Sequence, residues 1–87
     1  MKTYEFDLIL NGVSEITDEQ ADLLFANGCD DGTPVSRGGV AWIHFDRSAA
    51  SLEVAIQTAV TQVRSAGVGV LKVELDMNAT AYLETAT

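Results

Sequence analysis

The chain has 87 residues, a length that predicts a single domain with one modest core. Its hydrophobic content of 47% and charged content of 21% are those of an ordinary globular protein, which excludes the disordered and fibrous classes. Thirteen acidic residues against five basic ones give a formal net charge of −8, which disfavours nucleic acids and anionic membrane surfaces as partners.

The cysteine content and the N-terminal sequence indicate the cellular compartment of the protein. Cys29 is the single cysteine, so we expect no disulfide within the chain, no cysteine-based metal site and an unreactive, buried thiol. Residues 2–10 alternate between polar and apolar side chains, unlike a signal peptide, and no segment is long and apolar enough to span a bilayer. We therefore expect a cytoplasmic protein that is not associated with membranes.

Residues 4–10 predict the first strand, because apolar side chains occupy every second position and an Asn-Gly turn pair follows. Tyr4 and the alternate residues after it face the expected core. Glu5, Asp7 and Ile9 point to the other face of the strand.

A capping box predicts that a short helix begins at Asp18. Thr17 and Gln20 have the spacing at which each side chain hydrogen-bonds the backbone amide of the other. We expect the helix to end at the left-handed stop of Asn27-Gly28. Its expected core-facing residues are Ala21, Leu24 and Phe25.

The next two predicted strands form a hairpin. Pro34 puts the segment 33–35 at a sheet edge, since proline cannot donate to a ladder. The turn at residues 37–39 leads into residues 40–45, which we expect to form the central strand. Its alternation directs Ala41, Ile43 and Phe45 to the core and Val40, Trp42 and His44 to the opposite face.

Apolar residues at three- and four-residue spacing predict a long second helix, begun by Ser48 or Ser51 and closed by Gly67. Residues 68–75 then alternate as a last strand. In that strand we expect Leu71, Val73 and Leu75 to face the core and Val70, Lys72 and Glu74 to face away. Residues 77–87 have no strong period, which predicts a poorly ordered tail.

The order strand, helix, strand, strand, helix, strand is that of the α+β ferredoxin-like split β-α-β sandwich. We predict one such domain over residues 1–76, with a four-stranded antiparallel sheet and both helices on one face, because the crossovers are right-handed. The other face remains for solvent or a partner. The candidate partner-binding residues on it are Trp42, Val40, His44, Ile9, Asp7 and Lys72.

Residues 38–45 resemble the third strand of an RRM, which reads K/R-G-F/Y-G/A-F-V-x-F/Y. Trp42 stands at the position of a stacking aromatic. Val40 and Ile9, however, replace the other aromatics that stack RNA bases, and Glu5 and Asp7 would face the phosphates. Single-stranded RNA binding on this face is therefore an alternative hypothesis that the charge disfavours.

His44 is the residue that raises the question of catalysis or metal binding, with Asp7 or Glu5 across the sheet as its partner. No Ser, Cys or second His stands at a spacing that completes a catalytic triad or a zinc site. We interpret His44 as a solvated strand residue and the Asp30-Asp31 pair as part of a turn. We therefore expect no catalytic residue, no metal and no cofactor.

Several short stretches resemble a family of small, mostly uncharacterised bacterial proteins over residues 4 to about 75. They are GVSEITDE (12–19), LF (24–25), GCDDGTP (28–34), FDR (45–47), SLE (51–53) and AI (55–56). Longer members of that family carry a C-terminal helix-turn-helix segment, which is absent here, so DNA reading does not transfer to this chain. The resemblance implies a regulatory accessory domain for assembly or partner sensing, without catalytic residues.

These observations favour a non-enzymatic protein-interaction or dimerisation module that uses the face around Trp42. Besides RNA binding, a second alternative is small-ligand sensing at the loop of residues 29–33. An enzyme is the function least expected.

Overall fold

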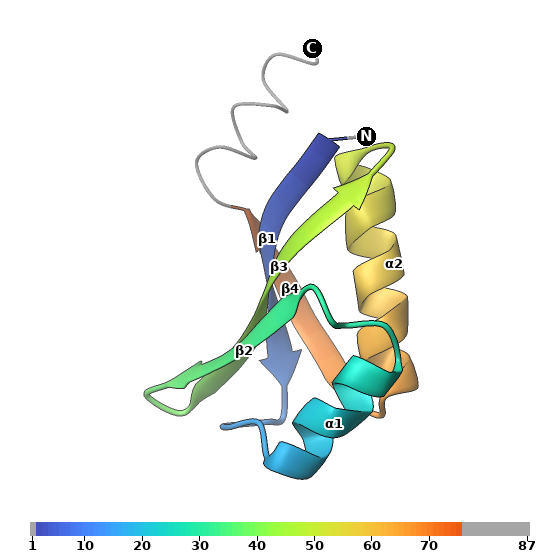
Figure 1. The fold of residues 1–87 in the computed structure, drawn as a ribbon. Helices are drawn as coiled ribbons and strands as arrows, with labels where there is room; N and C mark the ends of the chain where they lie inside the picture. The colour runs from blue at the N-terminus through green and yellow to red at the C-terminus, as the bar shows by residue number, and fades with distance from the viewer. Residues whose placement is uncertain (1, 76–87) are drawn as a thin grey trace.

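Six elements follow one another along residues 2–75, which are the residues that the computed structural model describes (Figure 1). They are β1 (Lys2–Asn11), α1 (Asp18–Ala26), β2 (Gly32–Arg37), β3 (Val40–Ala49), α2 (Leu52–Ser65) and β4 (Gly69–Leu75). The predicted tail at 77–87 lies outside the described residues, and so do the two ends of the predicted domain, residues 1 and 76.

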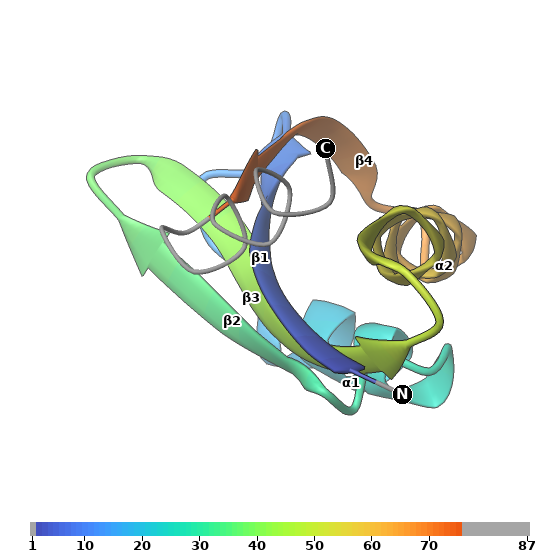
Figure 2. The same cartoon turned by 90° about the horizontal axis from the view of Figure 1, so that it is seen from above.

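The strands within this range pair as one antiparallel sheet in the order β2-β3-β1-β4. Both helices lie on the same side of that sheet (Figure 2). This arrangement is the predicted ferredoxin-like fold. Within residues 2–75 no helix covers the other side of the sheet, and we call that side the open face.

The central strand β3 has the predicted orientation. Ala41, Ile43 and Phe45 are buried on the helix side, whereas Trp42 and His44 are half-buried on the open face. Because side chains alternate along a strand, shifting the predicted face assignment of β3 by one residue would have moved Trp42 into the core.

Side-chain caps position the two helices. In α1 the Thr17 Oγ1 atom accepts from the amide of Gln20 at 3.1 Å, and the Gln20 Oε1 atom accepts from the amide of Thr17 at 3.0 Å. Ser51, and not Ser48, caps α2, since its hydroxyl accepts from the amide of Val54. Ser48 lies within β3, which continues four residues beyond the predicted strand.

The prediction that Phe25 faces the core is wrong. Its side chain is 69% exposed, and Leu24 is the residue of α1 that is buried. Neighbouring residues on a helix point about 100° apart, and α1 is short, so it contacts the sheet along a narrow stripe. The longer α2 follows its prediction, with buried side chains at Leu52, Ala55, Ala59 and Val63.

The predicted orientation of Leu71 and Val70 is also wrong. The register between β1 and β4 shifts after Ile9, so that Ile9 pairs with Lys72 whereas Leu10 pairs with Val70. The extra residue of such a bulge reverses the alternation of the strand. Leu71 is therefore 62% exposed, and Val70 packs against the core.

Candidate binding face

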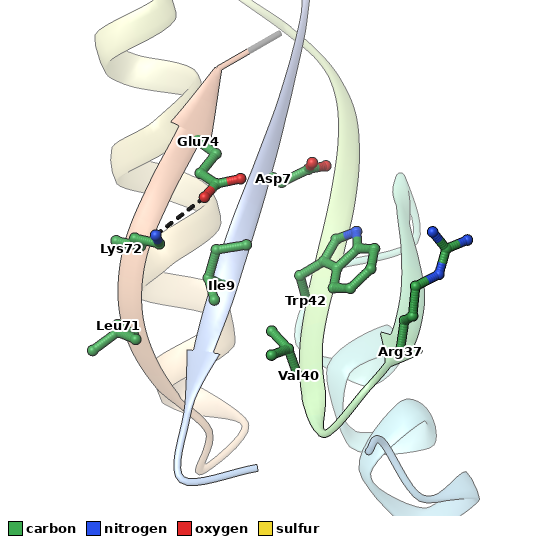
Figure 3. Close-up of a pocket in the computed structure, with 8 residues that line it drawn as sticks. All are labelled: Asp7, Ile9, Arg37, Val40, Trp42, Leu71, Lys72 and Glu74. Atoms are coloured by element: carbon green, nitrogen blue, oxygen red, sulfur yellow. Dashed lines mark ion pairs between the residues drawn. The ribbon is translucent and has the colours of Figure 1, made fainter. Parts of the chain in front are cut away.

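Five of the six predicted partner-binding residues line a hollow of about 530 Å³ on the open face (Figure 3). These five are Asp7, Ile9, Val40, Trp42 and Lys72, and the sixth, His44, is paired with Asp7 across the central strands. The hollow also includes Arg37, Leu71 and Glu74. Strand pairing therefore brings residues that are far apart in the sequence onto one surface.

One end of this surface is apolar. We define the apolar half as Ile9, Val40, Trp42 and Leu71, which come from three strands. Ile9 is 8% exposed although it faces away from the helices, and it lies between Trp42 and Lys72 in the register of the sheet. Val40 and Leu71 are exposed, so the apolar half combines a buried floor with solvent-accessible edges.

The other end of the surface is acidic, and we define the acidic half as Glu5, Asp7, Asp46 and Glu74, with His44 among them. The register pairs Asp7 with both His44 and Glu74, and it pairs Glu5 with Asp46. Carboxylates from three strands thus gather beside the apolar half.

His44 contacts three of these carboxylates. Its Nδ1 atom lies 2.7 Å from the Asp7 Oδ1 atom, and its Nε2 atom lies 3.6 Å from Glu5 Oε1 and 3.8 Å from Asp46 Oδ2. The hydrogen bond to Asp7 raises the pKa of His44, and the negative charges of Asp7, Asp46 and Glu5 add to this effect although burial opposes it. The side chain is 35% exposed, so it is partly solvated as expected, and it is paired most closely with Asp7, one of the two carboxylates that the sequence indicated.

The ligand atoms of Glu5, His44 and Asp46 lie within 4.8 Å of one another, a spacing at which they could hold a metal ion. Asp46 is exposed and the other two are partly exposed. Exposed carboxylates at this spacing are common without an ion, so the cluster alone does not indicate a metal.

The basic residues at the apolar half differ in their surroundings. Lys72 forms an ion pair with Glu74 at 3.1 Å, and both side chains are largely exposed. Arg37 comes from the edge strand β2, where it pairs with Val40 in the register. Sequence reasoning missed Arg37 as a residue of this face. Side chains alternate along a strand, so if Pro34 faces the helices, Arg37 three positions later faces the open side.

A second group that sequence reasoning missed lies on the helix side, around Arg47. Arg47 is 7% exposed, and its guanidinium donates to both oxygens of Asp31, at 2.7 and 2.8 Å. It also donates to Thr58 Oγ1 at 3.1 Å and to the carbonyl of Gly28 at 3.2 Å, and it lies over the ring of Phe45. These bonds tie the loop after α1 to β3 and α2.

This network bears on the loop of residues 29–33, the place considered for a small ligand. The Asp31 carboxylate is occupied by Arg47, and the Cys29 thiol is buried. Burial raises the pKa of Cys29, although the charge of Arg47 opposes the rise. The burial of this thiol agrees with the prediction.

Searches against protein-family models, curated proteins and solved structures found no match to this sequence. The bacterial family resemblance therefore remains a prediction. Neither helix within residues 2–75 has the length and apolar character needed to cross a membrane.

Proposed function

We propose that this protein is a non-enzymatic interaction module whose open face binds another polypeptide. The observation that carries the proposal is the apolar half of that face, where Trp42 and exposed Val40 and Leu71 surround a hollow that no described helix covers. Tryptophan in a shallow apolar depression with polar surroundings is typical of the centre of a protein interface. The partner is either a different protein or a second copy of this chain.

The charges of the same face argue against RNA as its ligand. Asp7 and Glu74 border the hollow, and Glu5 and Asp46 lie beyond them. Phosphates approaching a base stacked on Trp42 would meet these carboxylates, and the whole chain carries a net charge of −8. Ile9 supplies no ring for stacking, so the features that define an RNA-binding sheet are missing at this position.

A regulatory accessory role in the bacterial cytoplasm fits this proposal. The family resemblance implies assembly or partner sensing, and a lone buried thiol suits a reducing compartment. Among the described residues, His44 and Asp7 are hydrogen-bonded as a base and its orienting group would be, and this pair alone does not make a catalytic site.

The test is photo-cross-linking from the open face in cells. A photoreactive phenylalanine analogue at position 40 is expected to cross-link a discrete protein, and the same analogue at position 25, on the exposed outer side of α1, is expected not to. Adding Trp42→Ala should abolish the product from position 40 while the circular dichroism spectrum is unchanged. If Trp42→Ala leaves the product intact, or if position 40 gives no product, the proposal fails.

A further inference from the structure

Three side chains of the acidic half, Glu5, His44 and Asp46, project together from the two central strands. Glu5 and Asp46 are directly opposite each other in the register of β1 and β3, and His44 precedes Asp46 by two residues on β3. Residues two positions apart on a strand share a face, and residues opposite each other on paired strands are neighbours on it. The paired strands therefore hold one imidazole and two carboxylates beside one another.

The distances between the ligand atoms of these residues suit a tetrahedral metal ion. The His44 Nε2 atom lies 3.6 Å from Glu5 Oε1 and 3.8 Å from Asp46 Oδ2, and the three ligand atoms all lie within 4.8 Å of one another. Ligands about 2.1 Å from a tetrahedral Zn²⁺ ion are about 3.4 Å apart. Small rotations of partly exposed side chains would bring the three ligands around such an ion.

Spacing alone does not indicate a metal, and the orientation of the imidazole is a second observation. Asp7, which is not one of the three ligands, lies 2.7 Å from the Nδ1 atom of His44, and this contact turns Nε2 toward Glu5 and Asp46. A histidine that ligates a metal almost always donates its other ring N–H to a carboxylate, a carbonyl or water. In the neutral imidazole, donation from Nδ1 to Asp7 leaves the lone pair on Nε2, where an ion takes the place of a proton.

The cations of the open face are compatible with an ion at this position. Arg37 and Lys72 line the hollow and lie level with the residues of the apolar half, not with His44, and Lys72 is paired with Glu74. Two carboxylates and a neutral imidazole balance a divalent ion by themselves, so the site requires no excess of negative charge around it. A carboxylate has two oxygens, so Glu5 can ligate through Oε1 and keep its other contact.

We propose that Glu5, His44 and Asp46 form a binding site for a divalent transition-metal ion such as Zn²⁺, in which Asp7 orients the imidazole. An imidazole ligand favours Zn²⁺ over Mg²⁺ and Ca²⁺, which prefer ligands that are all oxygen. Three protein ligands leave a fourth position for water. This site differs from the sequence-based expectation that the chain binds no metal, and it does not depend on a polypeptide partner at the apolar half.

Nitrogen NMR of the histidine ring tests the site directly, because His44 is the single histidine of the chain. Long-range ¹H–¹⁵N spectra of the protein without a histidine tag are recorded while Zn²⁺ is added. We expect the Nε2 resonance to change until about one equivalent is bound, while Nδ1 keeps the chemical shift of a protonated nitrogen. Mg²⁺ at the same concentrations should leave both resonances unchanged.

Calorimetric titration with Zn²⁺ separates ligation from general attraction to an acidic protein. Glu5→Gln removes a ligand, and Glu19→Gln on the exposed side of α1 is its matched control, since both change the net charge equally. We expect His44→Gln and Glu5→Gln to weaken binding about tenfold or more, and Asp7→Asn to weaken it about tenfold. The control should bind within about threefold of wild type.

Several results would overturn the metal site. The first is a Zn²⁺ titration that leaves the Nε2 resonance unchanged or that changes Nδ1 as the ligated atom. Equal weakening by Glu5→Gln and Glu19→Gln is another, because binding would then reflect only the net charge of −8. Wild-type affinity in Asp7→Asn would overturn the orienting role of Asp7. Cross-linking from position 40 tests the polypeptide partner separately, so neither result decides the other.

Discussion

His44 lies among three carboxylates, and this environment stabilises its imidazolium form. The pKa of His44 is raised in the folded protein, principally by the hydrogen bond to Asp7. A group whose pKa is higher in the folded state than in the unfolded state stabilises the fold at pH values below its unfolded pKa. That stabilisation is lost as pH rises through the folded pKa.

We expect His44→Gln to reduce the free energy of unfolding more at pH 5.5 than at pH 8.5. The unfolded pKa of histidine is about 6.5, so the ion pair contributes at the lower pH and contributes less at the higher one. The additional loss should stay below about 1 kcal/mol, because the side chain is partly exposed. Urea unfolding of both proteins at the two pH values checks this, and a difference that is independent of pH would contradict it.

Arg47 and Asp31 form the other charged contact that matters at this scale, and here the guanidinium is buried. Asp31→Asn removes the counterion while the cation remains in place, so we expect a loss of about 3 kcal/mol in unfolding free energy. The comparison variant is Glu74→Gln, which breaks the exposed pair with Lys72 and should cost about 0.5 kcal/mol or less. Urea denaturation measures both, and similar losses would refute the structural role of Arg47.

At the scale of elements, β2 approaches the core so closely that it requires glycine at its first residue. A Cβ atom built on Gly32 would lie 2.7 Å from Ile43 Cγ2 and 3.0 Å from the Phe45 ring. Both side chains are almost fully buried on the central strand and have no space to move. Gly69 in β4 has no such contact, since its nearest neighbour would be 3.5 Å away.

Gly32→Ala is therefore expected to destabilise the protein by about 1–3 kcal/mol through overpacking. Gly69→Ala is the control, because it also changes a strand glycine whose φ lies outside the left-handed region, and it should be neutral or slightly stabilising. Thermal unfolding of the two variants makes the comparison. Equal melting temperatures would mean that β2 can move away from Ile43 and Phe45.

At the scale of the whole molecule, the net charge of −8 and the acidic half of the open face act in the same direction. We expect the chain to be monomeric at about 20 mM salt, because copies repel each other, and any self-association to increase when salt screens that repulsion. Sedimentation equilibrium at about 20 and 500 mM salt tests this. A dimer that is tightest at low salt would indicate complementary charges between copies and would contradict the prediction.

The placement of the candidate site followed from simple alternation in β1 and β3. Trp42, Val40 and Ile9 were assigned to the open face from period-2 patterns, and all three line the hollow there. The same rule misplaced Leu71, because the bulge opposite Ile9 depends on how β4 pairs with β1 and leaves no mark in the local pattern. Arg37 was assigned to the turn at residues 37–39, so it was not placed on a face of the sheet, whereas it is the last residue of β2.

By itself the sequence determined the order of the elements, the cap of α1 and the side of the sheet that carries Trp42. Each of these depends on residues within a few positions of one another, through periodicity or a side chain that caps a nearby amide. The tertiary structure alone decided that Arg47 is buried against Asp31 and that His44 contacts three carboxylates. These contacts join segments up to 39 positions apart, as between Glu5 and His44, so they depend on strand register and loop packing, which no local pattern encodes.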